Sequence, residues 1–516
     1  MFIFYRNAEN FPTEILKFCP FSFRILCVLS YSRMLSDLVM RLGHNLCLVC
    51  RRKKVYETDF MGSRDFISSL PDEVLGKNIL SLLPTKLVVS TSVLSKRWRN
   101  MFLFVDNFDL EDPTSLRNDG FSDFMEKTVA VLNNCPIKKL TLNCHYEQSS
   151  VNRWIFRALG RGCLELILQC RYGHSLNIRI FRRNTLVKLT LSSNRTVLEE
   201  YVPLHEGRVF FPALKTLSLG AVVADRALYN WFISGCPVLE ELFIRDVGDG
   251  DDQPTWTMSV FSASLKRLTI FFDFPHNIEP YKDDVEIQTP KLEFLDYSAL
   301  LSDDFEVDYL DSLAEARLDL RLWELNTTTQ LGDVANLVAA IRNVKTLHLS
   351  SGSLEAFYYC CDTMLVFDRL HHLSIESDEE NGWQGLPRLL LKSPNLQTLL
   401  IKGLVHKVTN RCGNVCACTN KPKKNFSYKR YIDRSPSDEM EGMCCLSTCR
   451  VKVLEILGYG GSSREMKQMW HFLGKLKYLE TVKIGVEEDT NNIGLLRDNL
   501  MALNRASANK CNIQFI

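Results

Sequence analysis

A short leucine motif recurs along most of this chain and limits the folds that it can adopt. Its form is L-x-x-L-x-L, with Leu, Ile, Val or occasionally Tyr at the apolar positions. Copies begin at Ile137, Leu186, Leu214, Leu239, Leu265, Leu292, Val344, Leu370 and Leu396, and irregular copies lie at 164–168 and 316–320. Successive copies are about 23 to 29 residues apart, a period typical of proteins built from stacked repeats.

Each copy predicts a short strand with alternate side chains buried. One unit cannot bury its apolar face alone, so neighbouring units must stack into a solenoid with a parallel sheet on its concave side. Residues 225–234 and 331–341 have helical spacing and are expected to cover the convex side. Motif and period are those of leucine-rich repeats, which we expect over residues 109–404. A doubly wound α/β enzyme is the alternative, but its strands would be continuous apolar runs.

The stretch from Asp65 to Phe102 has a different pattern and predicts three short helices. Pro71 suits the first turn of a helix, where a missing N–H is tolerated. Pro84 ends that helix and begins another, for which Thr85 is the expected N-cap. A segment this small has little interior, so we expect part of its apolar surface to bind a partner.

The same stretch resembles the plant F-box in four runs of sequence. These runs are Leu70-Pro71-Asp72-Glu73, Ile79-Leu80-Ser81, Leu83-Pro84-Thr85-Lys86 and Thr91 through Trp98. Two departures are visible: Lys77-Asn78 intrudes before Ile79, and Met101-Phe102 replaces the usual Leu-Trp. The resemblance implies that residues 61–108 dock to the Skp-type adaptor of a cullin–RING ubiquitin ligase. It also implies the adaptor-binding residues, which are Leu70, Pro71, Leu75, Ile79, Leu83, Pro84 and Val88, and a bundle closed by Trp98.

The C-terminal residues 449–516 are expected to continue the alternation of strand and helix. Strands are predicted at 451–457 and 479–484, and helices at 464–476 and 492–506. This tail resembles the FBD module found at the C-terminus of plant F-box/leucine-rich-repeat proteins. The expected fold class is therefore α/β: a small all-α three-helix F-box, a leucine-rich-repeat solenoid, and an FBD-type α/β end.

The 18 cysteines are scattered and do not form a compact disulfide framework, which favours a reducing compartment. Six of them, Cys412, Cys416, Cys418, Cys444, Cys445 and Cys449, gather around residues 405–448, a stretch read as a long polar loop. Their spacings differ from the paired C-x2-C of common zinc sites. The sequence therefore favours reduced thiols and predicts no metal and no cofactor, with structural zinc left open and His406 or His471 as the nearest further ligands.

Residues 1–60 have an atypical composition, with many phenylalanines among basic residues and no clear helix caps. We interpret them as an N-terminal extension that is disordered or an artefact of an over-extended gene model. Met61-Gly62-Ser63-Arg64 precedes the F-box-like stretch as a start codon would.

No catalytic motif is found in the sequence. Gly458-Tyr459-Gly460-Gly461 lacks the third glycine of a dinucleotide loop, since Ser463 stands in its place. His371-His372 lies in a repeat strand, where we expect one imidazole on the concave surface and the other at the boundary of the interior.

A formal charge of +1 gives no argument for nucleic acid, and no apolar run is long enough for a membrane span.

The F-box resemblance therefore implies a non-catalytic role. The chain would be the substrate-recognition subunit of an SCF-type (Skp–cullin–F-box) E3 ubiquitin ligase, with the repeats holding a target protein. Its partners would be the Skp-type adaptor, and through it the cullin and RING subunits, in the nucleus and/or cytoplasm. A repeat scaffold that binds proteins outside any ubiquitin ligase is the alternative.

Overall fold

The computed structural model describes residues 70–92, 95–111, 137–144, 148–170, 175–177, 181, 185–199, 211–223, 230, 232–247, 259–273, 285–301, 305–308, 310–322, 333–361, 364–409, 411–418, 445–486, 493–507 and 510–516. The predictions for residues 1–60 and for most of the polar loop at 405–448 lie outside these ranges. The chain divides into two compact units. Unit 1 runs to residue 142 and includes 161–163, and unit 2 contains 143–160 and 164–516.

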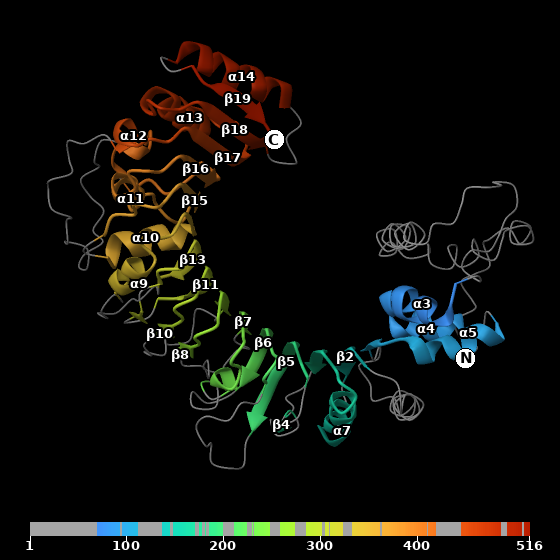
Figure 1. Cartoon of the computed structure of the whole chain (residues 1–516). Helices are drawn as coiled ribbons and strands as arrows, with labels where there is room; N and C mark the ends of the chain where they lie inside the picture. The colour runs from blue at the N-terminus through green and yellow to red at the C-terminus, as the bar shows by residue number, and fades with distance from the viewer. Residues whose placement is uncertain are drawn as a thin grey trace, which may run out of the picture. The chain divides into compact units, whose positions relative to one another are not determined.

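Unit 1 contains the three predicted helical segments, followed by two strands (Figure 1). The first segment joins α3 (Asp72–Val74), η3 (Leu75–Ile79) and η4 (Leu80–Leu82); the second is α4 (Thr85–Thr91); the third joins α5 (Lys96–Met101) and η5 (Phe102–Phe104). The strands are β1 (Asn107–Glu111) and β2 (Lys139–Cys144). Pro71 and Pro84 are the N-caps of the first two segments, and each proline carbonyl accepts the first backbone hydrogen bonds of its helix.

The helix changes type where Lys77-Asn78 interrupts the F-box pattern. Residues Leu75 to Ile79 form a π-helix, in which the Leu80 N–H bonds to the carbonyl of Leu75, five residues back. A π-turn holds one residue more than an α-turn between the same flanking residues. The π-turn thus provides room for one additional residue at Lys77-Asn78, and Leu75 and Leu80 on either side of these two residues are both buried.

The expected capping role of Thr85 is wrong. Pro84 is the N-cap of α4, and no side chain caps it. The Thr85 hydroxyl instead accepts a hydrogen bond of 2.7 Å from the Asp109 backbone N–H. Thr85 is 1% exposed, so its side chain ties helix α4 to strand β1 inside the unit.

Unit 2 is built on a parallel sheet whose strands pair in the order in which they occur in the chain. In order, they are β3 (Glu165–Cys170), β5 (Lys188–Glu199), β6 (Thr216–Val223), β7 (Glu241–Val247), β9 (Arg267–Asp273), β11 (Phe294–Leu300), β13 (Glu315–Arg321), β14 (Thr346–Leu349), β15 (His372–Glu376), β16 (Thr398–Lys402), β17 (Val453–Tyr459), β18 (Thr481–Val486) and β19 (Asn512–Phe515). The predicted repeat strands of this unit are present. A doubly wound enzyme would show a reversal of strand order, which this sheet lacks over the described strands.

The leucines of the repeat motif form the core of unit 2. In β6, for example, Leu217 and Leu219 are at most 1% exposed, and Leu214 at the start of the motif is fully buried. A recurring backbone contact fixes the register between neighbouring repeats. The carbonyl of Lys215 accepts hydrogen bonds from both Glu240 N–H and Glu241 N–H, and equivalent pairs recur along the sheet. Each repeat is therefore bonded to the repeats on either side of it, as expected for a solenoid.

The layer behind the sheet contains both helices and strands. Figure 1 shows α9 (Ala335–Ala340), α10 (Ser351–Tyr359), α11 (Leu386–Leu391) and α12 (Cys445–Thr448) on the outer side of unit 2, opposite the strands. The prediction at 331–341 is confirmed by α9, whereas of 225–234 only residues 230 and 232–234 are described, as helix. In between, a second parallel sheet forms from β8 (Ser259–Phe261), β10 (Val285–Gln288) and β12 (Phe305–Val307). This sheet was not predicted.

The C-terminal part continues the same sheet. Helix α13 (Ser463–Lys475) connects β17 to β18, and α14 (Ile493–Ala506) connects β18 to β19. A capping box begins α13: Ser462 Oγ accepts from the Glu465 N–H, and the Glu465 carboxylate accepts from the Ser462 N–H. Both predicted helices are present. Among the described helices, none is long and apolar enough to cross a membrane.

Candidate functional site

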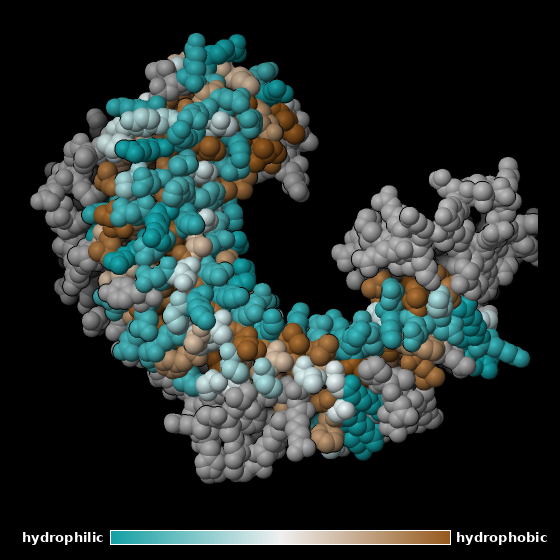
Figure 2. Space-filling view, viewed as in Figure 1, coloured by the Kyte–Doolittle hydropathy of each residue, from teal (hydrophilic) through white to brown (hydrophobic). Residues whose placement is uncertain are grey.

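The helices of unit 1 present apolar side chains to solvent. Leu82, Val89 and Leu103 are 40%, 37% and 38% exposed, and Pro71 and Pro84 are also exposed. Figure 2 shows apolar side chains at the surface of this unit, over α3. Exposed apolar groups on such short helices are typical of a surface that binds another protein.

The seven predicted adaptor-binding residues fall into two groups by burial. Leu70, Pro71, Ile79 and Pro84 are exposed or partly exposed, so they are available to a partner. Leu75, Leu83 and Val88 are at most 6% exposed and lie in the interior of the unit with Trp98, which is 4% exposed. Trp98 closes the bundle as predicted. Leu82, Val89 and Leu103 are further exposed apolar residues of these helices that the sequence-based assignment did not include.

A buried polar network braces these helices against strand β1. The Ser81 hydroxyl lies 3.0 Å from the Gly76 carbonyl and 3.1 Å from Asp106 Oδ1. Asp106 is 5% exposed, and its other carboxylate oxygen lies 2.5 Å from Lys138 Nζ. At the surface, Arg97 Nε donates to Asp72 Oδ1 at 2.8 Å, and Arg97 Nη2 donates to the Leu70 carbonyl. Arg97 thus holds the third helical segment to the start of the first.

Unit 2 offers a second candidate surface, the open strand face, formed by side chains that point away from the repeat core. Its first row, in cross-strand register, is Arg267, Phe294, Glu315, Thr346, His372, Thr398, Val453 and Thr481. Its second row is Thr269, Asp296, Arg317, His348, Ser374, Leu400, Glu455 and Lys483. Figure 2 shows mostly hydrophilic residues along these strands.

Arginines and phenylalanines meet on the N-terminal half of the open strand face. The Arg267 guanidinium lies 4.0 Å from the centre of the Phe294 ring, and that of Arg317 lies 5.5 Å from the same ring. Phe294 itself is 8% exposed, so the arginines form the outer layer here. Phe243 of β7 is 39% exposed in the neighbouring part of the face. Aromatic and arginine side chains carry much of the binding energy at protein interfaces. This part of the face therefore has the composition of a protein-binding surface.

Two histidines occupy neighbouring strands further along the face. The rings of His348 and His372 are 5.8 Å apart, and His348 Nε2 lies 3.5 Å from Glu315 Oε1. Burial lowers the pKa of both imidazoles; the Arg317 charge lowers that of His348 further, and Glu315 opposes the shift. His372 lies on the open face as expected, whereas His371 is exposed instead of lying at the interior boundary. The two imidazoles therefore add a titratable pair to the open strand face.

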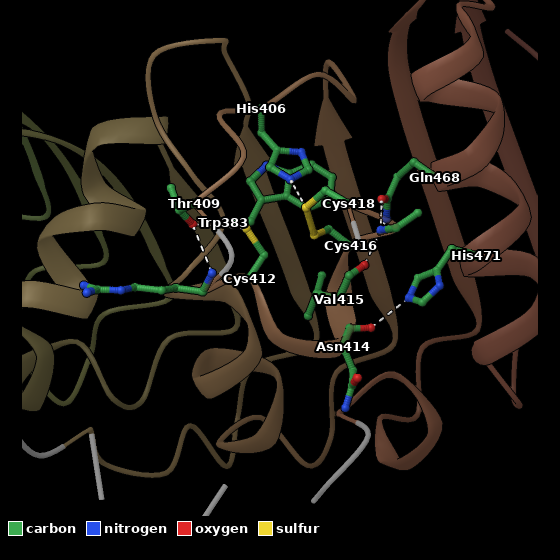
Figure 3. The surroundings of a disulfide bond; sticks show 12 residues. Trp383, His406, Thr409, Cys412, Asn414, Val415, Cys416, Cys418, Gln468 and His471 are labelled. Atoms are coloured by element: carbon green, nitrogen blue, oxygen red, sulfur yellow. Dashed lines mark hydrogen bonds between the residues drawn. A yellow bond between two sulfur atoms is a disulfide. The ribbon is translucent and has the colours of Figure 1, made fainter. Parts of the chain in front are cut away.

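Three of the six clustered cysteines come together with a histidine after strand β16 (Figure 3). One ligand atom from each of His406, Cys412, Cys416 and Cys418 lies within 4.8 Å of each of the others. Cys416 and Cys418 are joined by a disulfide, so the expectation of reduced thiols is wrong for this pair in the structure. Cys445 and Cys449 form no disulfide and are buried on or beside α12, outside this group, and Cys444 lies outside the described residues.

The histidine of this group is held by its neighbours. The ring of His406 stacks on Trp383, with centroids 4.1 Å apart and planes 14° apart, and its Nε2 lies 3.4 Å from Cys418 Sγ. Burial lowers the pKa of His406, an effect that the Leu404 backbone opposes and the Arg464 charge reinforces. Outside this group, burial raises the pKa of the Cys236 thiol to about 12, which keeps that thiol protonated.

Comparisons with known proteins match a family model to part of each unit. Residues 67–109 match the family model of the F-box domain, and residues 151–375 match the model described as "FBD-associated F-box protein At5g56370, LRR repeats". The chain is 78% identical over 458 residues to the F-box/LRR-repeat protein At5g35995 of Arabidopsis thaliana. That alignment covers 88% of this chain and 100% of the relative. It is 58% identical over 474 residues to the putative F-box protein At1g64540 and 48% identical over 483 residues to the F-box protein At4g27050, both of Arabidopsis thaliana. These alignments cover 88% of this chain, with 100% of the first relative and 99% of the second.

Proposed function

The chain belongs to the F-box/LRR-repeat proteins, and from this membership we propose that it is the substrate-recognition subunit of an SCF-type E3 ubiquitin ligase. Unit 1 docks to the Skp-type adaptor, and through it to the cullin and RING subunits. Unit 2 binds a target protein. The chain itself performs no covalent chemistry and acts in the nucleus and/or cytoplasm.

The observation that carries this proposal is the F-box match at residues 67–109 on helices that leave apolar side chains exposed. Leu70, Pro71, Ile79 and Pro84 are assigned to direct contact with the adaptor, joined by Leu82 and Val89 from the same helices. Leu75, Leu83 and Val88 contribute by packing beneath them, because they are buried within the unit. The first two helices begin at exposed prolines, which fix the backbone at the points where the contact begins.

The open strand face is the proposed surface for the target. Its mixture of arginine, phenylalanine, histidine and carboxylate side chains suits a protein partner with both charged and apolar groups. A ligase subunit of this kind accelerates ubiquitin transfer by holding the target close to the conjugating enzyme, which is a proximity effect. Residues 449–516 are proposed to be the FBD-type end, since they extend the sheet through β17, β18 and β19.

The experiment is a direct binding measurement between the purified chain and a purified Skp-type adaptor by calorimetry. We expect a one-to-one complex, and we expect Leu70→Ala combined with Pro71→Ala to weaken it by about 100-fold, because two central contacts are truncated. The control is Phe156→Ala, which removes an exposed aromatic side chain of α7 (Gln148–Leu159) and leaves unit 1 unchanged. Absence of binding by the wild-type chain would leave only the scaffold alternative.

A further inference from the structure

Four side chains that bind metals readily are gathered at one place in unit 2, although their spacing in sequence gives no recognised motif. A tetrahedral zinc ion has Zn–S distances of about 2.3 Å and Zn–N distances of about 2.0 Å, so its ligand atoms lie about 3.5 to 3.8 Å apart. The ligand atoms of His406, Cys412, Cys416 and Cys418 all lie within 4.8 Å of one another. Only small movements separate this arrangement from a tetrahedral site.

We propose that the reduced chain binds one Zn²⁺ ion through His406, Cys412, Cys416 and Cys418. Three thiolates and one imidazole make a Cys₃His set, which is one of the ligand sets of structural zinc. Four protein ligands leave no open position for a substrate, so the ion has a structural role and no catalytic one. Cys412, Cys416 and His406 are at most 8% exposed, and Cys418 is partly exposed, so most of the site is shielded from solvent.

The ligands are held in place by contacts that do not depend on the ion. Gln468 of α13 donates to the Val415 carbonyl at 2.9 Å and accepts from the Ala417 N–H at 2.7 Å. His471 Nε2 lies 2.8 Å from the Asn414 carbonyl. These bonds fix the backbone between Cys412 and Cys418 against α13 (Figure 3). The histidine ring is oriented by the Trp383 stack described above, and Trp383 is itself fixed by a 3.0 Å hydrogen bond from Nε1 to Ser377 Oγ.

A further buried group points to a ligand at this place. His406 is 8% exposed, and its Nε2 lies 3.4 Å from Cys418 Sγ. A buried imidazole beside three cysteine sulfur atoms has the composition of a Cys₃His metal site. Metal binding through one ring nitrogen would account for burying the ring here.

Zinc and the disulfide are mutually exclusive, because the same two sulfur atoms take part in both. A thiol reductant converts the Cys416–Cys418 disulfide to two cysteine thiols, and two thiols of the reductant become one disulfide. Zinc binding then displaces the protons of three cysteine thiols and transfers no electrons. In a compartment that keeps thiols reduced, the zinc form is the one expected.

The test is metal binding by the purified full chain, reduced with a phosphine, stripped by a chelator and titrated with Zn²⁺ or Co²⁺. We expect one ion per chain and a Co²⁺ absorption spectrum with thiolate charge-transfer bands and the visible bands of tetrahedral coordination. Cys412→Ser should weaken zinc binding at least tenfold, whereas Cys511→Ser, which changes a cysteine outside the group, should bind zinc as the wild type does.

A second measurement covers the case in which Cys412→Ser does not fold. Zinc should raise the melting temperature of the reduced wild-type chain and leave that of the oxidised chain unchanged, because binding stabilises only the state that holds the ion. Failure of the reduced chain to bind Zn²⁺, an octahedral Co²⁺ spectrum, or a Cys416–Cys418 disulfide that persists in the phosphine would overturn the proposal. None of these outcomes bears on adaptor binding by unit 1.

Discussion

Single residues determine whether the helices of unit 1 can pack as they do. Gly76 lies in the π-turn, where an added Cβ would fall 2.2 Å from Phe104 Cβ. A real side chain at this position would push η5 away from the first helical segment. Gly474 in α13 is the opposite case, because an added Cβ would meet nothing within 4 Å.

These two glycines should respond to alanine with opposite signs. Gly76→Ala should lower the free energy of unfolding of unit 1 by about 1 to 3 kcal/mol, the usual range for overpacking. Gly474→Ala should raise the stability of unit 2 by up to about 1 kcal/mol, because alanine favours the helix. Thermal unfolding of the full chain followed by calorimetry checks both, and an equal response at the two positions would contradict the packing of Gly76 against Phe104.

The histidine pair on the open strand face predicts a dependence of stability on pH. The pKa values of His348 and His372 are lower in the folded chain than the usual value of about 6.5. Between the folded and unfolded pKa values, the unfolded chain therefore binds more protons than the folded chain. The contribution of the pair to the free energy of unfolding is complete above a pH of about 6.5 and is lost as pH falls through the folded pKa values. When pH falls from 7.5 to 5.5, the melting temperature of the wild type should fall further than that of the double variant His348→Gln, His372→Gln. Parallel curves would contradict the burial of the two rings.

At the scale of elements, a change of helix type explains how an irregular F-box sequence keeps its surface. The π-helix at Leu75–Ile79 contains the extra residue, and the 3-10 turn η4 then carries the chain to Pro84. Leu75, the first residue of the π-helix, and Leu80, which follows it, are both at most 1% exposed. The flanking apolar residues thus face the same interior on both sides of the insertion.

Deleting Asn78 should convert the π-turn to an α-turn and leave the rest of unit 1 unchanged. We expect stability within about 1 kcal/mol of the wild type and undiminished adaptor binding, because the flanking residues keep their directions. Inserting one alanine after Asn78 is the matched control, since a further residue turns the following segment by about 100° and should abolish adaptor binding. Calorimetric titration with the adaptor measures both variants. Loss of binding on deletion would show that the π-turn itself is required.

Sequence and structure agree best where one pattern decides the outcome. The leucine motif predicted the repeat strands of unit 2, because each copy buries the same alternate residues against its neighbours. The strands β8, β10 and β12 were missed since each has only three or four residues and stands where the neighbouring repeats place helices. Short apolar runs do not distinguish helix from strand by period alone.

The sites were less predictable than the fold. Leu75, Leu83 and Val88 are buried by the packing of the helical segments within unit 1, which no local pattern reveals. The meeting of His406 with three cysteines depends on how residues 404–418 fold back on Trp383 and α13. The sequence offered six cysteines and two histidines as candidates, and no spacing among them singled out the four that meet.

At the scale of the whole molecule, the chain contains two surfaces with different compositions on two compact units. Unit 1 presents prolines and aliphatic side chains on short helices, and unit 2 presents rows of charged and aromatic side chains on parallel strands. Each surface is built on a core of its own, since the leucines beneath the open strand face belong to the repeats. The proposed function therefore requires that either surface can be disabled while the other keeps its partner.

The most direct measurement is affinity capture of the full chain from proteasome-inhibited plant cells, with adaptor and co-captured proteins quantified by mass spectrometry. The wild type should capture both the adaptor and a target. Leu70→Ala with Pro71→Ala should lose the adaptor and keep the target, whereas Phe243→Ala with Arg317→Ala should lose the target and keep the adaptor. A wild-type chain that captures no adaptor, or variants that lose both partners together while remaining folded, would contradict the proposed division of roles.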